Sequence, residues 1–230
     1  MDRQALRRIV RIPADSLELE GAFESPPGAR GLVVFAHGSG SSRMSPRNRY
    51  VAIALHQAGF ATLLLDLLTE QEDADRARRF DIALLSRRLL AAVRWARTDR
   101  ACAGLPIALF GASTGAAAAL EVAAALGPDI GAVVSRGGRP DLAPPGTLGR
   151  VAAPTLLIVG GADATVIGLN ELAYAQLACA RSLKIVPGAT HLFEEPGALE
   201  AVAGLAAQWF ARHLAAPGRA AAPAGTATGG

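Results

Sequence analysis

The sequence has few cysteines: Cys102 and Cys179 are the only two in its 230 residues. Two cysteines are too few for a disulfide framework, and they lack the spacing of a metal-binding motif, so we expect free thiols and no metal site. No run of about 18 apolar residues is present, so no membrane span is expected. Residues 1–20 also lack the apolar core of a signal peptide, which predicts a cytoplasmic protein.

An excess of one charge is also missing. The formal net charge is +3, and the basic residues are scattered along the chain without a long run of like charges. This pattern is typical of a solvated surface and argues against binding to nucleic acid. Residues 217–230 are rich in Ala, Gly, Pro and Thr and show no apolar period, which predicts a disordered tail. Residues 1–216 would then form a single domain.

Short apolar runs alternate with helical patterns along most of the chain. Alternating apolar residues at Ile9–Ile12 and Leu17–Gly21 predict an opening hairpin, and later continuous runs predict buried parallel strands. The alternation predicts an α/β fold with a mostly parallel sheet of about eight strands and helices on both faces. The connections are short, so no large cap domain is expected beyond a small flap at 137–149. The expected strands are 31–38, 61–66, 106–111, 131–135, 154–161 and 182–188, and the expected helices are 49–57, 82–96, 115–126, 169–180 and 198–214.

Residues 111–115 read Gly-Ala-Ser-Thr-Gly at the junction between an expected strand and an expected helix. A Gly-x-Ser-x-Gly sequence in this place is typical of a nucleophile elbow, a tight turn that presents a serine hydroxyl to substrate. Ser113 is therefore the expected nucleophile, and the backbone N–H of Thr114 is directed toward a developing oxyanion. The alternative is a turn that serves only as a helix cap.

A catalytic serine needs a general base, and the base needs a carboxylate that orients it. In this architecture the chain order is serine, then acid, then histidine. Asp163 and His191 each follow an expected strand downstream of Ser113, so all three would meet at the same edge of the sheet. Asp163 could instead be a turn residue, in which case Asp141 or Glu194 would be the acid.

The segment Ala36–Arg43 reads AHGSGSSR and follows the first expected central strand. Its glycines allow backbone N–H groups to face the crevice, so Ser39 is the expected second oxyanion donor, with Gly40 next, and His37 braces the loop. A phosphate-binding loop is the alternative. However, the Gly-Lys-Ser/Thr of a P-loop is missing, and Arg43 stands where the dinucleotide fingerprint needs a glycine. No cofactor is therefore expected.

Several side chains near these loops are candidates for substrate binding. Met44, Leu68 and Phe193 are expected pocket walls, although each could equally belong to the core. Arg136 and Arg139 follow an expected strand and could hold an anionic group of the substrate through paired hydrogen bonds. Alternatively, these arginines pair with nearby carboxylates or lie in water. Further arginines that follow the oxyanion loop are Arg43, Arg47 and Arg49.

The strand order, the Gly-Ala-Ser-Thr-Gly turn, Asp163, His191 and His37-Gly38 together resemble an α/β-hydrolase of the dienelactone-hydrolase-like group, over about residues 5–215. Segments such as HGSGSSRMSPRNRY and PGATHLFEEPG also resemble a bacterial branch of small hydrolases. Some of these are fused to phosphoribosyltransferase domains, and no such domain is expected here. The resemblance implies hydrolysis of a carboxylic ester or lactone through an acyl-enzyme. Dienelactone hydrolase itself has a cysteine nucleophile, so Ser113 favours a general carboxylesterase.

Other functions use the same residues. An acyltransferase, a thioesterase or a peptidase would share the triad and differ in the shape of the pocket. A catalytically silent protein with this fold would only bind a metabolite or a partner protein. The presence of all three triad residues and the oxyanion loop favours the enzyme. The expected partner is a small-molecule ester, and the chain is expected to be a monomer or a homodimer.

Overall fold

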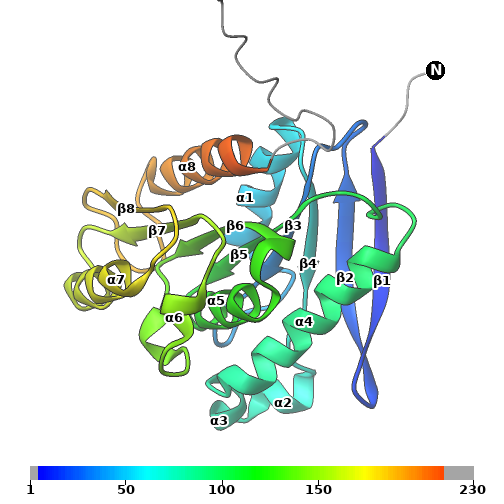
Figure 1. Cartoon of the computed structure of the whole chain (residues 1–230), viewed down its shortest axis with the longest axis horizontal. Helices are drawn as coiled ribbons and strands as arrows, with labels where there is room; N and C mark the ends of the chain where they lie inside the picture. The colour runs from blue at the N-terminus through cyan, green and yellow to red at the C-terminus, as the bar shows by residue number, and fades with distance from the viewer. Residues whose placement is uncertain (1–4, 215–230) are drawn as a thin grey trace, which may run out of the picture.

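The computed structural model of the protein describes residues 5–214, which form one eight-stranded sheet with helices on both faces (Figure 1). The strands are β1 Leu6–Ala14, β2 Leu17–Ser25, β3 Leu32–Ala36, β4 Ala61–Leu65, β5 Ile107–Ala112, β6 Ile130–Arg136, β7 Thr155–Gly160 and β8 Arg181–Val186. They lie in the order β1-β2-β4-β3-β5-β6-β7-β8. The hairpin β1–β2 is antiparallel, β2 runs antiparallel to β4, and the other neighbours are parallel. The expected mostly parallel sheet of eight strands is thus confirmed.

The helices are α1 Pro46–Gln57, α2 Glu70–Ala74, α3 Arg76–Arg79, α4 Ile82–Thr98, α5 Thr114–Leu126, α6 Thr147–Arg150, α7 Ala164–Gln176 and α8 Ala198–His213, with 3-10 turns η1 Gly127–Asp129 and η2 Pro140–Leu142. One expected helix is wrong in its bounds, because α7 spans Ala164–Gln176 rather than residues 169–180. The β-branched residues and the glycine in the first turns of α7 have low helix propensity, which hid its start. The predicted boundary at residue 216 and the predicted tail at 217–230 lie outside the described residues.

The core consists of two apolar layers, one on each face of the sheet. Alternation along β3 sends Leu32 and Val34 toward the layer that contains α4, α5 and α7, whereas Val33 and Phe35 enter the layer that contains α1 and α8. Because both faces are covered, all five residues of β3 and all five of β4 are buried. The loops at the carboxyl ends of the strands therefore rest on a rigid support, as expected for a site built on an open parallel sheet.

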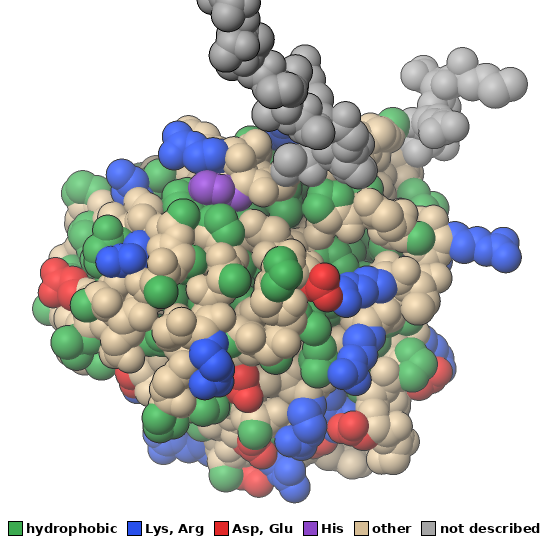
Figure 2. Space-filling model, viewed as in Figure 1, with side chains coloured by type: hydrophobic (Ala, Val, Ile, Leu, Met, Phe, Trp, Pro, Cys, Tyr) green, Lys and Arg blue, Asp and Glu red, His purple; other side chains and the backbone are tan. Residues whose placement is uncertain are grey.

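The surface carries charges of both signs. Basic and acidic side chains are interspersed over the face shown in Figure 2, in agreement with the scattered arginines of the sequence. Among the helices of residues 5–214, none has the length and apolarity needed to cross a bilayer. Both cysteines are free, as expected, and burial raises the pKa of the Cys102 thiol to about 12, which makes this thiol a poor nucleophile.

Candidate active site

Ser113 lies at the turn between β5 and α5 in a conformation that is rare for a residue with a side chain. Its backbone has φ 51° and ψ −121°. Among residues 5–214, the other non-glycine residues with positive φ are Asp15 and Phe193. The turn is held from the β6 side, because the Ser113 N–H donates to the carbonyl of Arg136 at 3.2 Å and the Arg139 N–H donates to the carbonyl of Ser113 at 3.1 Å. This strained turn is the geometry expected of a nucleophile elbow.

The two glycines of the turn allow α5 to pack close to the sheet. A Cβ atom on Gly115 would lie 2.2 Å from the carbonyl oxygen of Ala36, and a Cβ atom on Gly111 would lie 2.5 Å from Cα of Ala116. Both distances are far below van der Waals contact, and the atoms met are backbone atoms that cannot move aside. Any other residue at these positions would push the helix, and Ser113 with it, away from the sheet.

His191 joins Ser113 and Asp163 in one row of hydrogen bonds. Its Nδ1 lies 2.7 Å from Oδ2 of Asp163, and its Nε2 lies 3.3 Å from Oγ of Ser113. Asp163 follows β7 at the N-cap of α7, and His191 follows β8, so three different strands deliver the three side chains. Because the carboxylate accepts the Nδ1–H, the neutral imidazole presents a free Nε2 lone pair to the serine hydroxyl. This row can remove a proton from Ser113.

The two alternative acids are engaged elsewhere. Asp141 receives two hydrogen bonds from Arg139, at 2.8 and 2.7 Å, and Glu194 accepts from Arg47 at 2.8 Å. The carboxylate at Nδ1 of His191 is therefore that of Asp163. The same contacts involve Arg139, which the sequence suggested as a substrate ligand. Its Nε and Nη2 both donate to Asp141 and are therefore not available to a substrate.

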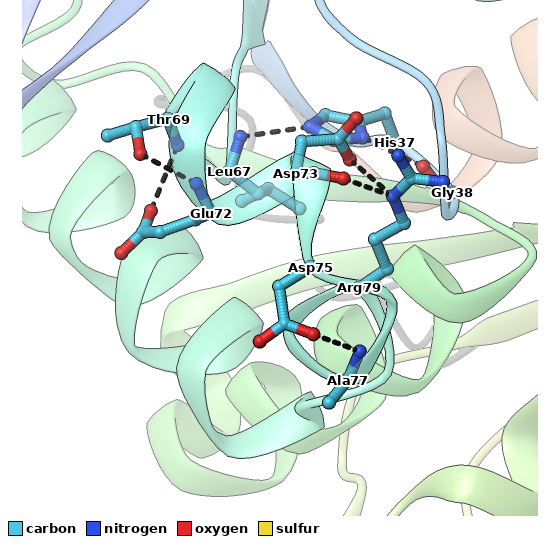
Figure 3. Close-up of polar contacts among 9 residues, drawn as sticks. All are labelled: His37, Gly38, Leu67, Thr69, Glu72, Asp73, Asp75, Ala77 and Arg79. Carbon is cyan, nitrogen blue, oxygen red and sulfur yellow. Dashed lines mark hydrogen bonds and ion pairs between the residues drawn. The ribbon is translucent and has the colours of Figure 1, made fainter.

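His37 braces the loop that follows β3, as expected from the sequence (Figure 3). Its Nδ1 lies 2.9 Å from the carbonyl oxygen of Gly38, and its Nε2 accepts a hydrogen bond from the Leu67 N–H at 2.9 Å. A ring that donates at one nitrogen and accepts at the other is neutral, and burial lowers the pKa of His37, which keeps it neutral. The imidazole thus ties the loop after β3 to the end of β4.

The loop braced by His37 passes directly beside the serine. A Cβ atom on Gly38 would lie 3.0 Å from Cβ of Ser113. Ser39 is the next residue in the chain after this close approach. On the other side, Thr114 is the first residue of α5, and its N–H has no acceptor within the helix. The segments that carry the two expected backbone donors, Ser39 and Thr114, therefore adjoin Ser113 in the chain or in space.

A short charged segment beyond β4, residues 69–79, adjoins this loop and was not recognised in the sequence. It contains α2, which begins with a capping box between Thr69 and Glu72, and α3, which is capped by Asp75 (Figure 3). Arg79 bonds to the carbonyl of Asp73 at 2.5 Å. The pattern Thr-x-x-Glu was the available signal for the start of this segment.

Two cavities lie near the elbow loops, and they divide the expected pocket walls. Met44 and Leu68 line a cavity of about 500 Å³ between the loop after β3 and α2, where Arg43 binds Asp66. Phe193 lines a different cavity of about 430 Å³ beside α1 and the loop of His191, and its ring is otherwise buried in the core. Within residues 5–214 no group of three His, Cys, Asp or Glu side chains could hold a metal ion.

Comparison with known proteins places these features in context. A sequence model of the dienelactone hydrolase family matches residues 19–215. Two curated relatives from Mycobacterium tuberculosis strains, both named "Putative phosphoribosyl transferase", are 56% identical over 209 residues, which cover 91% of this chain and 47% of each relative. The chain thus spans about half the length of the curated relatives it matches.

Solved structures confirm the α/β-hydrolase fold. The crystal structure of dienelactone hydrolase from Anabaena variabilis ATCC 29413 is 53% identical, with a TM-score of 0.88 over 92% of this chain and 99% of that chain. Est1E from Butyrivibrio proteoclasticus is 18% identical and has the same fold, with a TM-score of 0.73 over 88% of this chain and 99% of that chain.

Proposed function

Because this chain belongs to the dienelactone hydrolase family, we propose that it is a serine hydrolase that cleaves a small carboxylic ester or lactone through an acyl-enzyme intermediate. One observation carries the proposal: the hydrogen-bonded row of Asp163, His191 and Ser113 at the carboxyl edge of the sheet. A serine in a strained turn, a base within reach of its hydroxyl and a carboxylate behind that base are the parts that nucleophilic acyl transfer requires.

In the acylation step, Oγ of Ser113 attacks the ester carbonyl while Nε2 of His191 takes the hydroxyl proton. The carboxylate of Asp163 stabilises the imidazolium that forms. The carbonyl oxygen becomes an oxyanion, which the backbone N–H groups of Thr114 and Ser39 bind. Collapse of the tetrahedral intermediate breaks the bond to the alcohol oxygen, and His191 returns the proton to that oxygen, so the alcohol leaves and the acyl group stays on Ser113.

In the deacylation step, water takes the place of the alcohol. His191 removes a proton from the water, the hydroxide oxygen attacks the acyl carbon, and the bond to Oγ of Ser113 breaks as Ser113 regains its proton. The products are a carboxylic acid and the free enzyme. These two steps balance without a metal or an organic cofactor, because His191 takes up and returns each proton that is transferred.

The mycobacterial relatives are named as transferases, but this chain covers 47% of the length of each relative. The hydrolase family model, by contrast, matches residues 19–215 of this chain, which include Ser113, Asp163 and His191. We therefore infer a hydrolytic role for the chain. Acyl transfer to another acceptor, thioester cleavage and peptide cleavage are the alternatives that use the same side chains.

The proposal is tested with p-nitrophenyl esters of increasing acyl length, matched thioesters and a fluorophosphonate probe. We expect turnover of the oxygen esters, labelling of the wild-type protein, and neither turnover nor labelling in Ser113→Ala. A Ser16→Ala variant is the matched control, since Ser16 is exposed in the turn between β1 and β2 and lies outside the hydrogen-bonded row. Labelling that persists in Ser113→Ala would place the nucleophile elsewhere.

A further inference from the structure

Arg136 is a buried guanidinium without a hydrogen-bond partner. It is the last residue of β6, and its exposed fraction is 8%. Among the described residues, neither Nε nor Nη1 of Arg136 has an acceptor, and both atoms are shielded from solvent. A guanidinium remains charged at neutral pH and carries five N–H donors, so burial of this group without an acceptor destabilises the fold. The arrangement lacks a negatively charged partner.

The neighbouring arginines differ from Arg136 in this respect. Arg43 bonds to Asp66, Arg47 bonds to Glu194, and Arg139 bonds to Asp141. Asp66, Glu194 and Asp141 are therefore already paired with other cations. Arg136 differs from these three arginines because it has no carboxylate partner among the described residues and because its Nε and Nη1 are shielded from solvent.

The position of Arg136 in the sheet brings it beside the elbow. It is in register with Ala112, the residue before Ser113, and its carbonyl accepts the Ser113 N–H. By alternation along β6, its side chain lies on the same face as Val134, which is the face covered by α1 and α8. The next residue, Gly137, approaches the catalytic loop, because a Cβ there would lie 3.5 Å from Cε1 of His191.

A second cation lies on this face. Arg47 is in the first turn of α1, and its charge, together with burial, lowers the pKa of Arg136 to about 10. Burial is the larger of the two causes, and Arg136 is still protonated at neutral pH. Arg47 also lines the cavity of about 430 Å³ that includes Phe193. Arg47 is partly exposed and bonded to Glu194, so its charge is a secondary contribution to the positive potential that favours an anion at Arg136.

We propose that Arg136 forms an oxyanion-binding site next to Ser113 that takes a carboxylate or phosphate group. The group is either part of the substrate or a free anion that binds beside it. An oxyanion supplies the acceptors that Nε and Nη1 lack, and two parallel N–H···O bonds to a guanidinium fix its orientation. A substrate held in this way has its ester carbonyl positioned relative to Ser113, and this substrate-borne form of the proposal rests on the proposed hydrolase function.

The binding test does not depend on hydrolysis. Thermal unfolding and titration calorimetry are carried out with inorganic phosphate and with succinate, at constant ionic strength, on the wild type, Arg136→Met and Arg136→Lys. Methionine fills a similar volume without charge. We expect Arg136→Met to melt at a higher temperature than the wild type without added anion, because a buried unpaired charge is removed. We also expect the anion to raise the melting temperature of the wild type but not that of Arg136→Met.

The matched control is Arg150→Met, which removes the same charge from an exposed position on α6. This variant should retain the full anion-dependent rise in melting temperature. The proposal is overturned if Arg136→Met melts at a lower temperature and keeps the anion-dependent rise. That outcome would mean that Arg136 is structural and satisfied by water or by Glu195, whose Oε2 is also buried without a partner. The absence of any rise in the wild type would overturn it as well.

A kinetic test separates the two sources of the anion. Mono-p-nitrophenyl succinate and p-nitrophenyl butyrate differ in a terminal carboxylate in place of a methyl group. If the anion belongs to the substrate, we expect kcat/KM of the wild type to favour the succinate by about tenfold or more, and this ratio to fall toward one in Arg136→Met. A ratio near one in the wild type, together with phosphate binding through Arg136, identifies a free anion. Anion binding without hydrolysis of either ester would reject the proposed function and leave the site supported.

Discussion

Asn170 donates a hydrogen bond from Nδ2 to the carbonyl of Gly138 at 3.0 Å, which ties the interior of α7 to the loop after β6. Asn170 is fully buried, and its Nδ2 also donates to the carbonyl of Val166 at 2.8 Å. The loop it holds contains Arg139, whose N–H in turn supports the carbonyl of Ser113. Since α7 begins directly after Asp163, the Asn170 amide connects the helix that follows the acid to the loop that supports the nucleophile.

The first prediction concerns this link. Asn170→Leu leaves the carbonyl of Gly138 buried without a donor, so we expect a loss of about 1–3 kcal/mol in the free energy of unfolding. We also expect kcat on an accepted ester to fall more than KM changes, because the loop that supports Ser113 loses its anchor. Urea unfolding and steady-state kinetics check both effects. Equal rates in the two proteins would show that the loop is held without the amide.

The second prediction concerns Ser113 itself. We expect Ser113→Ala to lower kcat/KM by about four to six powers of ten, because the nucleophile is lost. We expect Ser113→Gly to be equally inactive but more stable than Ser113→Ala by about 1 kcal/mol, since glycine adopts a φ of 51° without steric strain. Unfolding curves of the two variants give the difference. If Ser113→Gly is the less stable of the two, the turn is not strained.

The third prediction compares two aspartates. Asp163→Asn should lower kcat by about 10³–10⁴, because an amide no longer holds His191 in the tautomer that can accept the serine proton. Asp141→Asn should have a small effect on kcat, since Asp141 contacts Arg139 and not His191. Side-by-side kinetics at one pH, with circular dichroism to verify folding, are sufficient. A large loss of kcat in Asp141→Asn together with a small loss in Asp163→Asn would show that Asp141 is the acid.

The fourth prediction is a pH dependence of stability. Burial is the main cause that lowers the pKa of His37, His56 and His213 below the ordinary value of 6.5. The unfolded chain therefore binds more protons than the folded chain below about pH 6.5, and the free energy of unfolding decreases as the pH falls through that range. Stability conferred by the neutral rings is fully present above pH 6.5.

His37→Gln tests the contribution of the buried loop histidine. Glutamine can still accept the Leu67 N–H but does not titrate, so the slope of unfolding free energy against pH should be shallower in this variant than in the wild type. Urea unfolding at several pH values between about 5 and 8 measures the slope. An unchanged slope would mean that His37 is as easily protonated in the folded protein as in the unfolded chain.

Most of the sheet and the hydrogen-bonded row at its edge were predictable from sequence because their signals are local. Gly111 to Gly115 carry the turn, and Asp163 and His191 each directly follow an apolar run. Parallel strands bring their carboxyl ends to one edge, so chain order was enough to place the three side chains together. The loop role of His37 was predictable for the same reason.

Features that depend on long-range packing were not predictable. The burial of Arg136 results from the register of β6 beside β5 and β7 and from the helices above it, whereas its sequence context resembles that of Arg139, which is paired and more exposed. The early start of α7 was hidden by Thr165, Val166 and Gly168, whose low helix propensity is outweighed by packing against the sheet.

The segment of α2 and α3 has a consequence for how the cavity beside it can change. Neither helix contains a buried residue, yet Glu70 and Asp73 line the cavity that also contains Met44 and Leu68. Substitutions at surface positions outside caps and buried contacts usually alter stability by only about 0.5 kcal/mol or less. Glu72 pairs with the buried Arg88 and Asp75 caps α3, so these two positions are constrained. Glu70 has neither role, and variation at this position can reshape one wall of the cavity without weakening the core.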